Sequence, residues 1–248
     1  MIPEIIDVGW VDPEYVSGHF AHSIAGQIRD MEYHDCAGRI YRHSASQPIV
    51  ARNNVMQEFL DDSDSPWLWL VDADMVFDKG HSMKLWLAAQ DYEADIVTGL
   101  TFIWKEGRYV VPSLFYEDGE NGLRLVYNKI PKSGTEVAAS GLASVLIRRE
   151  VIETMQAVRH KDYRWFDFLT NADLGINGDE MTGIDVQFFI RAKKVYGYKM
   201  IVEPDAKAIS VETMPIGCDE WKRQWQKESQ SQACQPGSKP KRFYDNNK

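Results

Sequence analysis

Residues 66–78, PWLWLVDADMVFD, decide the fold because an apolar run ends here in a pair of acids. The run from Trp67 to Val71 is continuously apolar rather than alternating, which is typical of a central strand covered on both faces. Asp72 and Asp74 follow, separated by Ala73. On an extended chain, side chains two residues apart project to the same side. We therefore expect both carboxylates to address one point beyond the carboxyl end of the strand.

Paired acids at that edge indicate a ligand site, because open α/β sheets bind ligands outside the carboxyl ends of their strands. Two close carboxylates repel each other unless a cation lies between them, and hard divalent cations with oxygen ligands are the usual solution. A cation held by Asp72 and Asp74 could clamp a diphosphate. The alternative is that the two acids only end the strand, since Asp is common in turns. The strongly apolar strand before them favours the functional interpretation.

The composition is that of an ordinary globular protein, with 44% hydrophobic and 26% charged residues among 248 and a formal net charge of −9. Proteins that bind nucleic-acid backbones usually carry a basic excess, so the charge gives no strong nucleic-acid-binding signature.

No apolar stretch approaches the roughly 20 residues of a membrane span. The start, MIPEIIDVGW, does not resemble a signal peptide. Cys36, Cys218 and Cys234 fit neither a disulfide framework nor a zinc site. We therefore expect a cytoplasmic protein.

Strand and helix patterns alternate along the first hundred residues, and a mixed half follows. We expect helices at 20–31, 49–60, 82–90, 149–158 and 186–196, and strands at 5–10, 38–42, 67–71, 96–102, 144–147 and 199–203. Two further strands, 109–116 and 123–127, are expected to form a hairpin. The pattern predicts one α/β domain over 1–218, with a mixed, mostly parallel central sheet flanked by helices. The polar composition beyond it predicts a partly flexible C-terminal extension at 219–248.

Five stretches resemble the GT-A glycosyltransferases, and within them the small bacterial and phage enzymes related to glycosyltransferase family 2. They are ARNNVMQEFL (51–60), WLWLVDADMVF (67–77), ADIVTGLTF (94–102), ASGLASVLIRREVIE (139–153) and GIDVQFFIRAKKVYGYKMIVEP (183–204). Each stretch is unremarkable alone, and their order and spacing make the resemblance specific. It implies a Rossmann-like GT-A fold, with a nucleotide-sugar half at about 1–100 and an acceptor half at about 101–218.

The resemblance also implies roles for single residues. Asp72 and Asp74 occupy the D-x-D positions, where the family uses the first acid toward ribose or metal and the second as a ligand of Mn²⁺ or Mg²⁺. Ala73 lies between them in the donor site. Arg52 matches a position that faces the donor, and a guanidinium there suits a diphosphate. Asp185 matches the general base of inverting members, which takes the proton of the acceptor hydroxyl.

Two departures from the family pattern concern the base and the metal. Ile184 stands where the family usually has Glu before its catalytic Asp. In the stretch AKAISVET, Ser210 stands where the family commonly has a metal-ligating His. Ser is a poor replacement for imidazole, although Glu212 could reach the metal if the loop is shifted.

Several candidate residues have a structural reading beside the functional one. Trp10 could stack on the donor's nucleobase or pack in the core. Trp104 is a candidate acceptor platform, as are Trp165 and Phe166, yet aromatic side chains are more often core. Gly141 matches a tight loop beneath the acceptor, but it and Gly99 could simply permit close packing. Asp185 could cap a helix that begins at Val186.

Taken together with the acid pair, the resemblance implies an inverting, metal-assisted glycosyltransferase that moves a sugar from a nucleoside diphosphate to an acceptor hydroxyl. The acceptor could be a protein, a glycan, a lipid-linked sugar or a modified nucleobase. Two alternatives stay open. A nucleotidyltransferase also uses paired acids and a metal, although no Gly-rich basic phosphate loop occurs before residue 40. A non-catalytic sugar- or nucleotide-binding module would explain Ile184 and Ser210.

Overall fold

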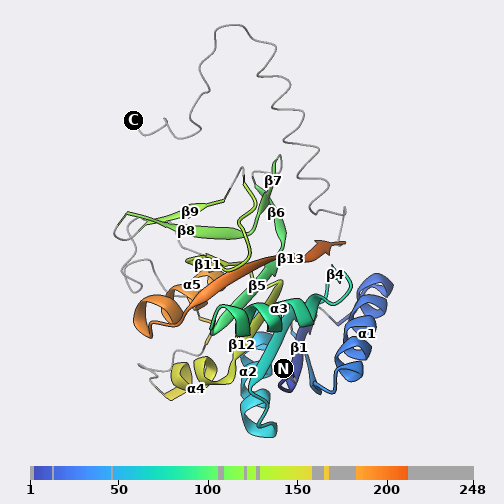
Figure 1. Cartoon of the computed structure of the whole chain (residues 1–248). Coiled ribbons are helices and arrows are strands. Elements are labelled where there is room, and N and C mark those ends of the chain that lie inside the picture. Colours follow the sequence, from blue (N-terminus) through green and yellow to red (C-terminus); the bar gives the residue numbers. More distant parts are fainter. Residues whose placement is uncertain are drawn as a thin grey trace, which may run out of the picture.

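The structure is a computed structural model that describes residues 3–12, 14–45, 47–105, 109–119, 122–126, 129–157, 165–167 and 183–211. The extension expected at 219–248 lies outside the described residues, as do Glu212, Cys218 and Cys234. The centre of the molecule is an eight-stranded sheet with the order β10-β13-β5-β12-β3-β1-β2, and β4 pairs with β13 beside this path (Figure 1).

The sheet is built from strands that are far apart in the sequence. Its members are β1 (Ile6–Asp12), β2 (Ala37–Ser44), β3 (Trp67–Asp72), β4 (Met75–Phe77), β5 (Ile96–Leu100), β10 (Thr135–Glu136), β12 (Ser144–Arg148) and β13 (Met200–Ser210). β1 is parallel to β2 and β3, and β13 is parallel to β5, while β12 lies antiparallel between β3 and β5. The carboxyl ends of the parallel strands therefore meet at one edge, where β3 delivers Asp72.

Helices cover both faces of this sheet. They are α1 (Gly18–Tyr33), α2 (Pro48–Asp62), α3 (His81–Asp91), α4 (Arg149–Ala157) and α5 (Ile184–Ile190), which continues into a π-helical turn, η1 (Arg191–Val195). All five residues from Trp67 to Val71 are 0% exposed. Trp67, Trp69 and Val71 share a core with α1 and α3, whereas Leu68 and Leu70 share the opposite core with α2, α4 and α5. The predicted central strand, buried on both faces, is confirmed.

Two small sheets lie over the α5 side of the fold (Figure 1). One consists of β8 (Leu114–Asp118), β9 (Gly122–Leu125) and β11 (Ala139–Ser140), and the other of β6 (Phe102–Lys105) and β7 (Tyr109–Pro112). The expected hairpin is therefore only partly right, because the single strand predicted at 109–116 is two strands in different sheets. β7 ends at Pro112, whose nitrogen has no hydrogen to donate to a neighbouring strand. Ser113 then donates its N–H to the carbonyl of Thr101, at the break between β5 and β6.

The strand expected at 199–203 is also longer than predicted. β13 continues to Ser210 and pairs with β4, a short strand that we did not predict. Beyond Pro204 buried Ala206 and Ala208 alternate with exposed Lys207, which is the pattern of a strand with one covered face. The remaining expected helices and strands are confirmed, with ends that differ by one or two residues.

A buried histidine joins the layers near the edge of the sheet. His81 is 0% exposed, its Nδ1 lies 3.0 Å from the carbonyl oxygen of Lys207, and its Nε2 lies 2.7 Å from Ser144 Oγ. Because a carbonyl only accepts, Nδ1 carries the proton, and Nε2 accepts the proton of Ser144. Ser144 Oγ in turn accepts from Trp69 Nε1 at 3.0 Å. Burial lowers the pKa of His81, which agrees with a neutral imidazole.

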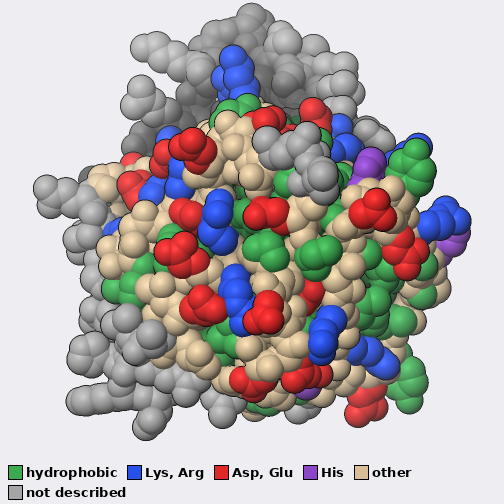
Figure 2. Space-filling model, turned by 60° about the horizontal axis from the view of Figure 1, so that its bottom comes forward, with side chains coloured by type: hydrophobic (Ala, Val, Ile, Leu, Met, Phe, Trp, Pro, Cys, Tyr) green, Lys and Arg blue, Asp and Glu red, His purple; other side chains and the backbone are tan. Residues whose placement is uncertain are grey.

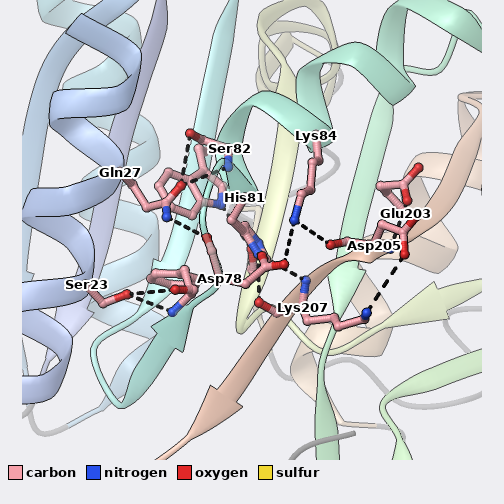
Figure 3. A network of polar contacts seen from close by, with 12 residues as sticks. Ser23, Gln27, Asp78, His81, Ser82, Lys84, Glu203, Asp205 and Lys207 are labelled. Atoms are coloured by element: carbon pink, nitrogen blue, oxygen red, sulfur yellow. Dashed lines mark hydrogen bonds and ion pairs between the residues drawn. The ribbon is translucent and has the colours of Figure 1, made fainter. Parts of the chain in front are cut away.

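Further polar contacts hold the loop before α3 to β13 (Figure 3). Asp78 accepts from Lys84 Nζ at 2.5 Å, and the same Nζ reaches the carbonyl of Asp205 at 2.9 Å. Gly99 of β5 lies under the His81 ring, where an added Cβ would be 3.0 Å from the imidazole. The close approach of this ring gives Gly99 a packing role. These contacts fix β4 and the end of β13 against the sheet.

We predict that His81→Ala destabilises the protein by about 3 kcal/mol, because it leaves a cavity and removes the acceptor of the buried Ser144 hydroxyl proton. Urea denaturation followed by circular dichroism measures the free energy of unfolding. His22→Ala, on the exposed side of α1, is the control and should change it by less than about 0.5 kcal/mol. A His81→Ala protein as stable as the control would contradict the structural role.

Candidate active site

One arginine binds two carboxylates that come from opposite halves of the chain. Arg52, in α2, donates from Nη1 to Asp185 Oδ1 at 2.7 Å. Its Nη2 donates to Asp72 Oδ1 at 2.8 Å and to Oδ2 at 3.1 Å. Burial alone would lower the pKa of Arg52, but the two carboxylates outweigh it and hold that pKa above its usual value. The structure thus brings together three of the residues that the sequence singled out.

The two acids of the D-x-D stretch have different partners. β3 ends at Asp72, and the chain turns at residues 73–74 before β4 begins. We expected both acids to project to one side because we assumed an extended chain. The chain forms a turn here instead, so the expectation does not hold. Ala73 is 7% exposed, and its N–H donates to the carbonyl of Val11 at the end of β1. Asp72 therefore meets Arg52, while Asp74 is carried over toward β13.

Ser210 lies beside Asp74. β13 and β4 pair with Ser210 opposite Met75, and the N–H of Val211 donates to the main-chain oxygen of Asp74 at 2.9 Å. Ser210 Oγ then donates to Asp74 Oδ2 at 2.8 Å. Ser210 is thus in direct contact with the second acid of the D-x-D stretch.

Asp185 lies in the first turn of α5, whose N-cap residue is Gly183. α5 begins at Ile184 rather than at the expected Val186, so Asp185 is inside the helix and is not its cap. Burial raises the pKa of Asp185, the charge of Arg52 lowers it, and the charge of Asp72 raises it further, so that the pKa lies above its usual value. The N–H of Leu142 contributes in the direction that lowers the pKa of this carboxylate.

The residue after Arg52 forms a second link between the two halves. Asn53 Nδ2 donates to the carbonyl of Phe166 at 2.8 Å, and the N–H of Phe166 donates back to Asn53 Oδ1 at 3.1 Å. The Phe166 ring stacks on Phe188 of α5, with 5.0 Å between ring centroids. Two consecutive residues of α2 thus hold the helix that carries Asp185 and the segment packed against it.

The aromatic candidates divide according to burial. Trp165 is 3% and Phe166 is 1% exposed, so both belong to the core, and neither is a surface platform for a sugar. Trp10 packs edge-on against Phe20 of α1, and its buried Nε1 has no hydrogen-bond partner among the described residues. Trp104 lies in β6, and its side chain lies outside the described residues.

Gly141 lies directly before Leu142, whose N–H contributes to the pKa of Asp185. The N–H of Gly141 donates to Ser113 Oγ at 3.1 Å, and an added Cβ would come within 2.7 Å of that oxygen. The close packing against Ser113 explains the glycine. A role beneath an acceptor stays a prediction.

Sequence reasoning missed Asn53 and the N–H of Leu142. The only signal for Asn53 was its place next to Arg52 on an otherwise apolar helix face, where a buried amide needs partners. Nothing in the sequence indicates the N–H of Leu142, since every residue except proline carries one.

A third acid at the same edge is fully engaged by the protein itself. Asp12, at the end of β1, accepts from Arg42 Nε at 2.6 Å, Ser44 Oγ at 2.6 Å and the N–H of Glu14 at 2.8 Å. The hydrogen bond from Arg42 is the main cause that lowers the pKa of Asp12 to about 2. Asp12 therefore joins the ends of β1 and β2 rather than offering a ligand.

The donor atoms at the edge fit a cation that arrives with a diphosphate. Among the described residues, no group of three or more His, Cys, Asp and Glu side chains is placed to hold a metal ion. Mg²⁺, however, is usually bound through one or two carboxylates, with substrate phosphates as further ligands. The hard oxygens of Asp72, Asp74 and Ser210 suit that mode. The described residues could thus supply part of a coordination shell, which the substrate phosphates would have to complete.

The surface adds little about partners. On the face shown in Figure 2, acidic and basic side chains are interspersed, without a gathered basic patch. Within the described ranges, no helix has both the length and the apolar character that crossing a membrane requires.

Comparison with known proteins gives a likeness in structure only. No protein-family model matches the chain, and no curated protein has a significantly similar sequence. Protein A197 from STIV is similar in structure, with a TM-score of 0.55, 18% sequence identity, and coverage of 84% of this chain and 85% of A197. The two proteins share a fold.

A second solved structure, the 1–349 segment of TarS from S. aureus, has a TM-score of 0.44 and 12% identity, over 81% of this chain and 58% of that one. Its TM-score is too low to support an argument. The fold itself is the mixed α/β, Rossmann-like arrangement that the resemblance to GT-A enzymes implied, and that prediction is confirmed.

We predict that Asn53→Ala lowers the free energy of unfolding by about 2–3 kcal/mol, because it removes two buried hydrogen bonds and leaves the main chain of Phe166 unpaired. Chemical denaturation measures the loss. Gln57→Ala is the control on the same helix, since Gln57 donates to Asp61 at the surface, and it should change stability by less than about 0.5 kcal/mol. Equal effects of the two substitutions would show that Asn53 does not hold the Phe166 segment.

Proposed function

We propose that this protein is a nucleotide-sugar-dependent glycosyltransferase, and that it transfers sugar with inversion at the anomeric carbon. The observation that carries the proposal is the Asp72–Arg52–Asp185 cluster at the carboxyl edge of the sheet. It joins the acid expected at the donor to the acid expected as base, from two segments that are distant in sequence. Open α/β sheets bind ligands at that edge.

The proposed base is Asp185. Its carboxylate takes the proton of the acceptor hydroxyl while the oxygen attacks the anomeric carbon from the side opposite to the diphosphate. The bond from this carbon to the diphosphate oxygen breaks, and the configuration of the sugar inverts. General base catalysis of this kind contributes about 10²–10⁴-fold. Arg52 orients the Asp185 carboxylate, and the raised pKa of Asp185 makes it a stronger base than an exposed Asp.

The donor side of the site is proposed to be Asp72, Ala73 and Asp74, with Trp10 at the end of β1 toward the nucleobase. A Mn²⁺ or Mg²⁺ ion held by Asp72 and Asp74, with Ser210 beside them, would supply Lewis-acid stabilisation of the departing nucleoside diphosphate. Support for this placement comes from the hydrogen bond between Ser210 and Asp74, which puts a hydroxyl oxygen next to the second of the two acids.

The acceptor side is proposed to be formed by Gly141 and Trp104 and the small sheets that carry or adjoin them. β11 directly precedes Gly141 and packs against α5, the helix that carries Asp185. The acceptor presents a hydroxyl and can be a protein, a glycan, a lipid-linked sugar or a modified nucleobase.

We predict that the protein, incubated with Mn²⁺ and a panel of sugar nucleotides, releases free nucleoside diphosphate by transfer or slow hydrolysis. Asp74→Asn and Asp185→Asn should each reduce release at least 100-fold, because they remove a donor-site charge and the proton acceptor. Chromatography of the nucleotides measures the product. Asp91→Asn, an exposed acid at the end of α3, should retain full activity.

Three results would contradict this proposal in different ways. Release of pyrophosphate would indicate a nucleotidyltransferase, and nucleotide binding without turnover would indicate a binding module. A product with retained anomeric configuration, seen by NMR, would remove the role of Asp185 as base.

We further predict an acid limb in the pH dependence of turnover that lies above the ordinary pKa of Asp. The active form of the base is the carboxylate, and the pKa of Asp185 is raised from 3.8, so turnover falls as the pH drops through this raised pKa. Initial rates between pH 4 and pH 9 under saturating donor measure the limb. A rate that stays constant down to pH 4 would contradict a base with a raised pKa.

A further inference from the structure

We infer that Arg52 is a positioning residue that fixes Asp185 relative to Asp72 and does not itself bind the donor diphosphate. The inference rests on the proposed function, because it concerns how the proposed base is held. It departs from the expectation drawn from the sequence, in which the guanidinium of Arg52 faces the donor. Three observations carry it: the burial of Arg52, the occupation of its terminal nitrogens, and the linkage that it makes.

The first observation is the order of exposure within the cluster. The Arg52 side chain is 9% exposed, whereas the side chains of Asp72 and Asp185 are 26% and 32% exposed. The guanidinium therefore lies beneath the carboxylates, which are the members that a ligand can reach. Its Nε is also buried. A phosphate that approached from the exposed side would therefore meet Asp72 and Asp185 before it met Arg52.

The second observation is that the terminal nitrogens already have carboxylate partners. Nη1 binds Asp185, and Nη2 binds both oxygens of Asp72, at distances between 2.7 and 3.1 Å. Hydrogen bonds between charged groups are among the strong ones in proteins. Replacing either carboxylate by a phosphate would leave a half-buried acid without its counter-charge, which is unfavourable.

The third observation is the geometry of the linkage. A guanidinium is a rigid planar fork, so its two terminal nitrogens fix the positions of the two acids relative to each other. A lysine ammonium is a single point charge and cannot impose this arrangement. Arg52, from the first half of the chain, thereby holds a base that lies in the second half. Arg52 thus sets where the base stands relative to the donor-side acid.

The kinetic test separates positioning from donor binding. We expect Arg52→Lys to lower kcat by about 100-fold, the effect of a misplacement of about 1 Å. KM for the sugar nucleotide, and Kd for the nucleoside diphosphate by calorimetry, should stay within about threefold of wild type. A residue that binds the diphosphate equally in substrate and transition state would instead raise KM and Kd with little change in kcat. That result would overturn the inference.

Arg148→Lys is the matched control. Arg148 also pairs with an acid, Asp95, but it lies opposite Trp67 at the other end of β3. We expect the kcat, KM and Kd of the Arg148→Lys variant to match those of the wild-type protein. A 100-fold loss of kcat in this variant as well would show that the effect of Arg52→Lys is not specific to the cluster, and would overturn the inference.

A crystal structure of the wild-type protein with nucleoside diphosphate and Mg²⁺ tests the same point without any variant that must fold. We expect Arg52 to remain on Asp72 and Asp185, with no phosphate oxygen within hydrogen-bond distance of its nitrogens. A phosphate bound to Arg52 would overturn the inference while leaving the glycosyltransferase intact. Absence of sugar transfer by the wild-type protein would instead refute the proposed function, and this inference with it.

Discussion

The shared guanidinium of Arg52 is the interaction on which the site depends. Two acids in a partly buried location would repel each other. Without a positive charge between them, ionising both would cost much free energy. Arg52 supplies that charge from α2, which lies against β1 and β2, while its partners come from the end of β3 and the start of α5. One side chain therefore compensates both acids and ties the two halves of the chain together.

The surrounding fold serves this arrangement through two separate cores. Alternation along β3 directs Leu68 and Leu70 to the α2 side, and Asp72, the next residue in the same register, meets α2 as well. The other face is filled by Trp67 and Trp69 and by the neutral hydrogen-bond chain through Ser144 and His81. Because both faces are packed against helices, the strand that carries the first acid has little freedom to shift.

Much of the fold could be predicted from local pattern, and the site only in part. Apolar runs and helical periodicity predicted the central sheet and its covering helices, because these patterns depend on residues that are close in sequence. The prediction of one strand at 109–116 and of a strand ending at residue 203 was wrong. The split at Pro112 and the extension of β13 depend on partners that are distant in sequence, such as Thr101 and β4. Resemblance pointed to Arg52, Asp72 and Asp185 one by one. Only the folded chain shows that a single guanidinium holds both acids.

The pairing of β4 with the end of β13 has a consequence for how such a chain can change over generations. Ser210 meets Asp74 because it lies at a fixed step along a ladder that begins after the irregularity between Glu203 and Lys207. Adding or deleting one residue in this segment would turn every following side chain to the opposite face. Descendants of this sequence should therefore keep the length of the stretch from Lys207 to Ser210 constant.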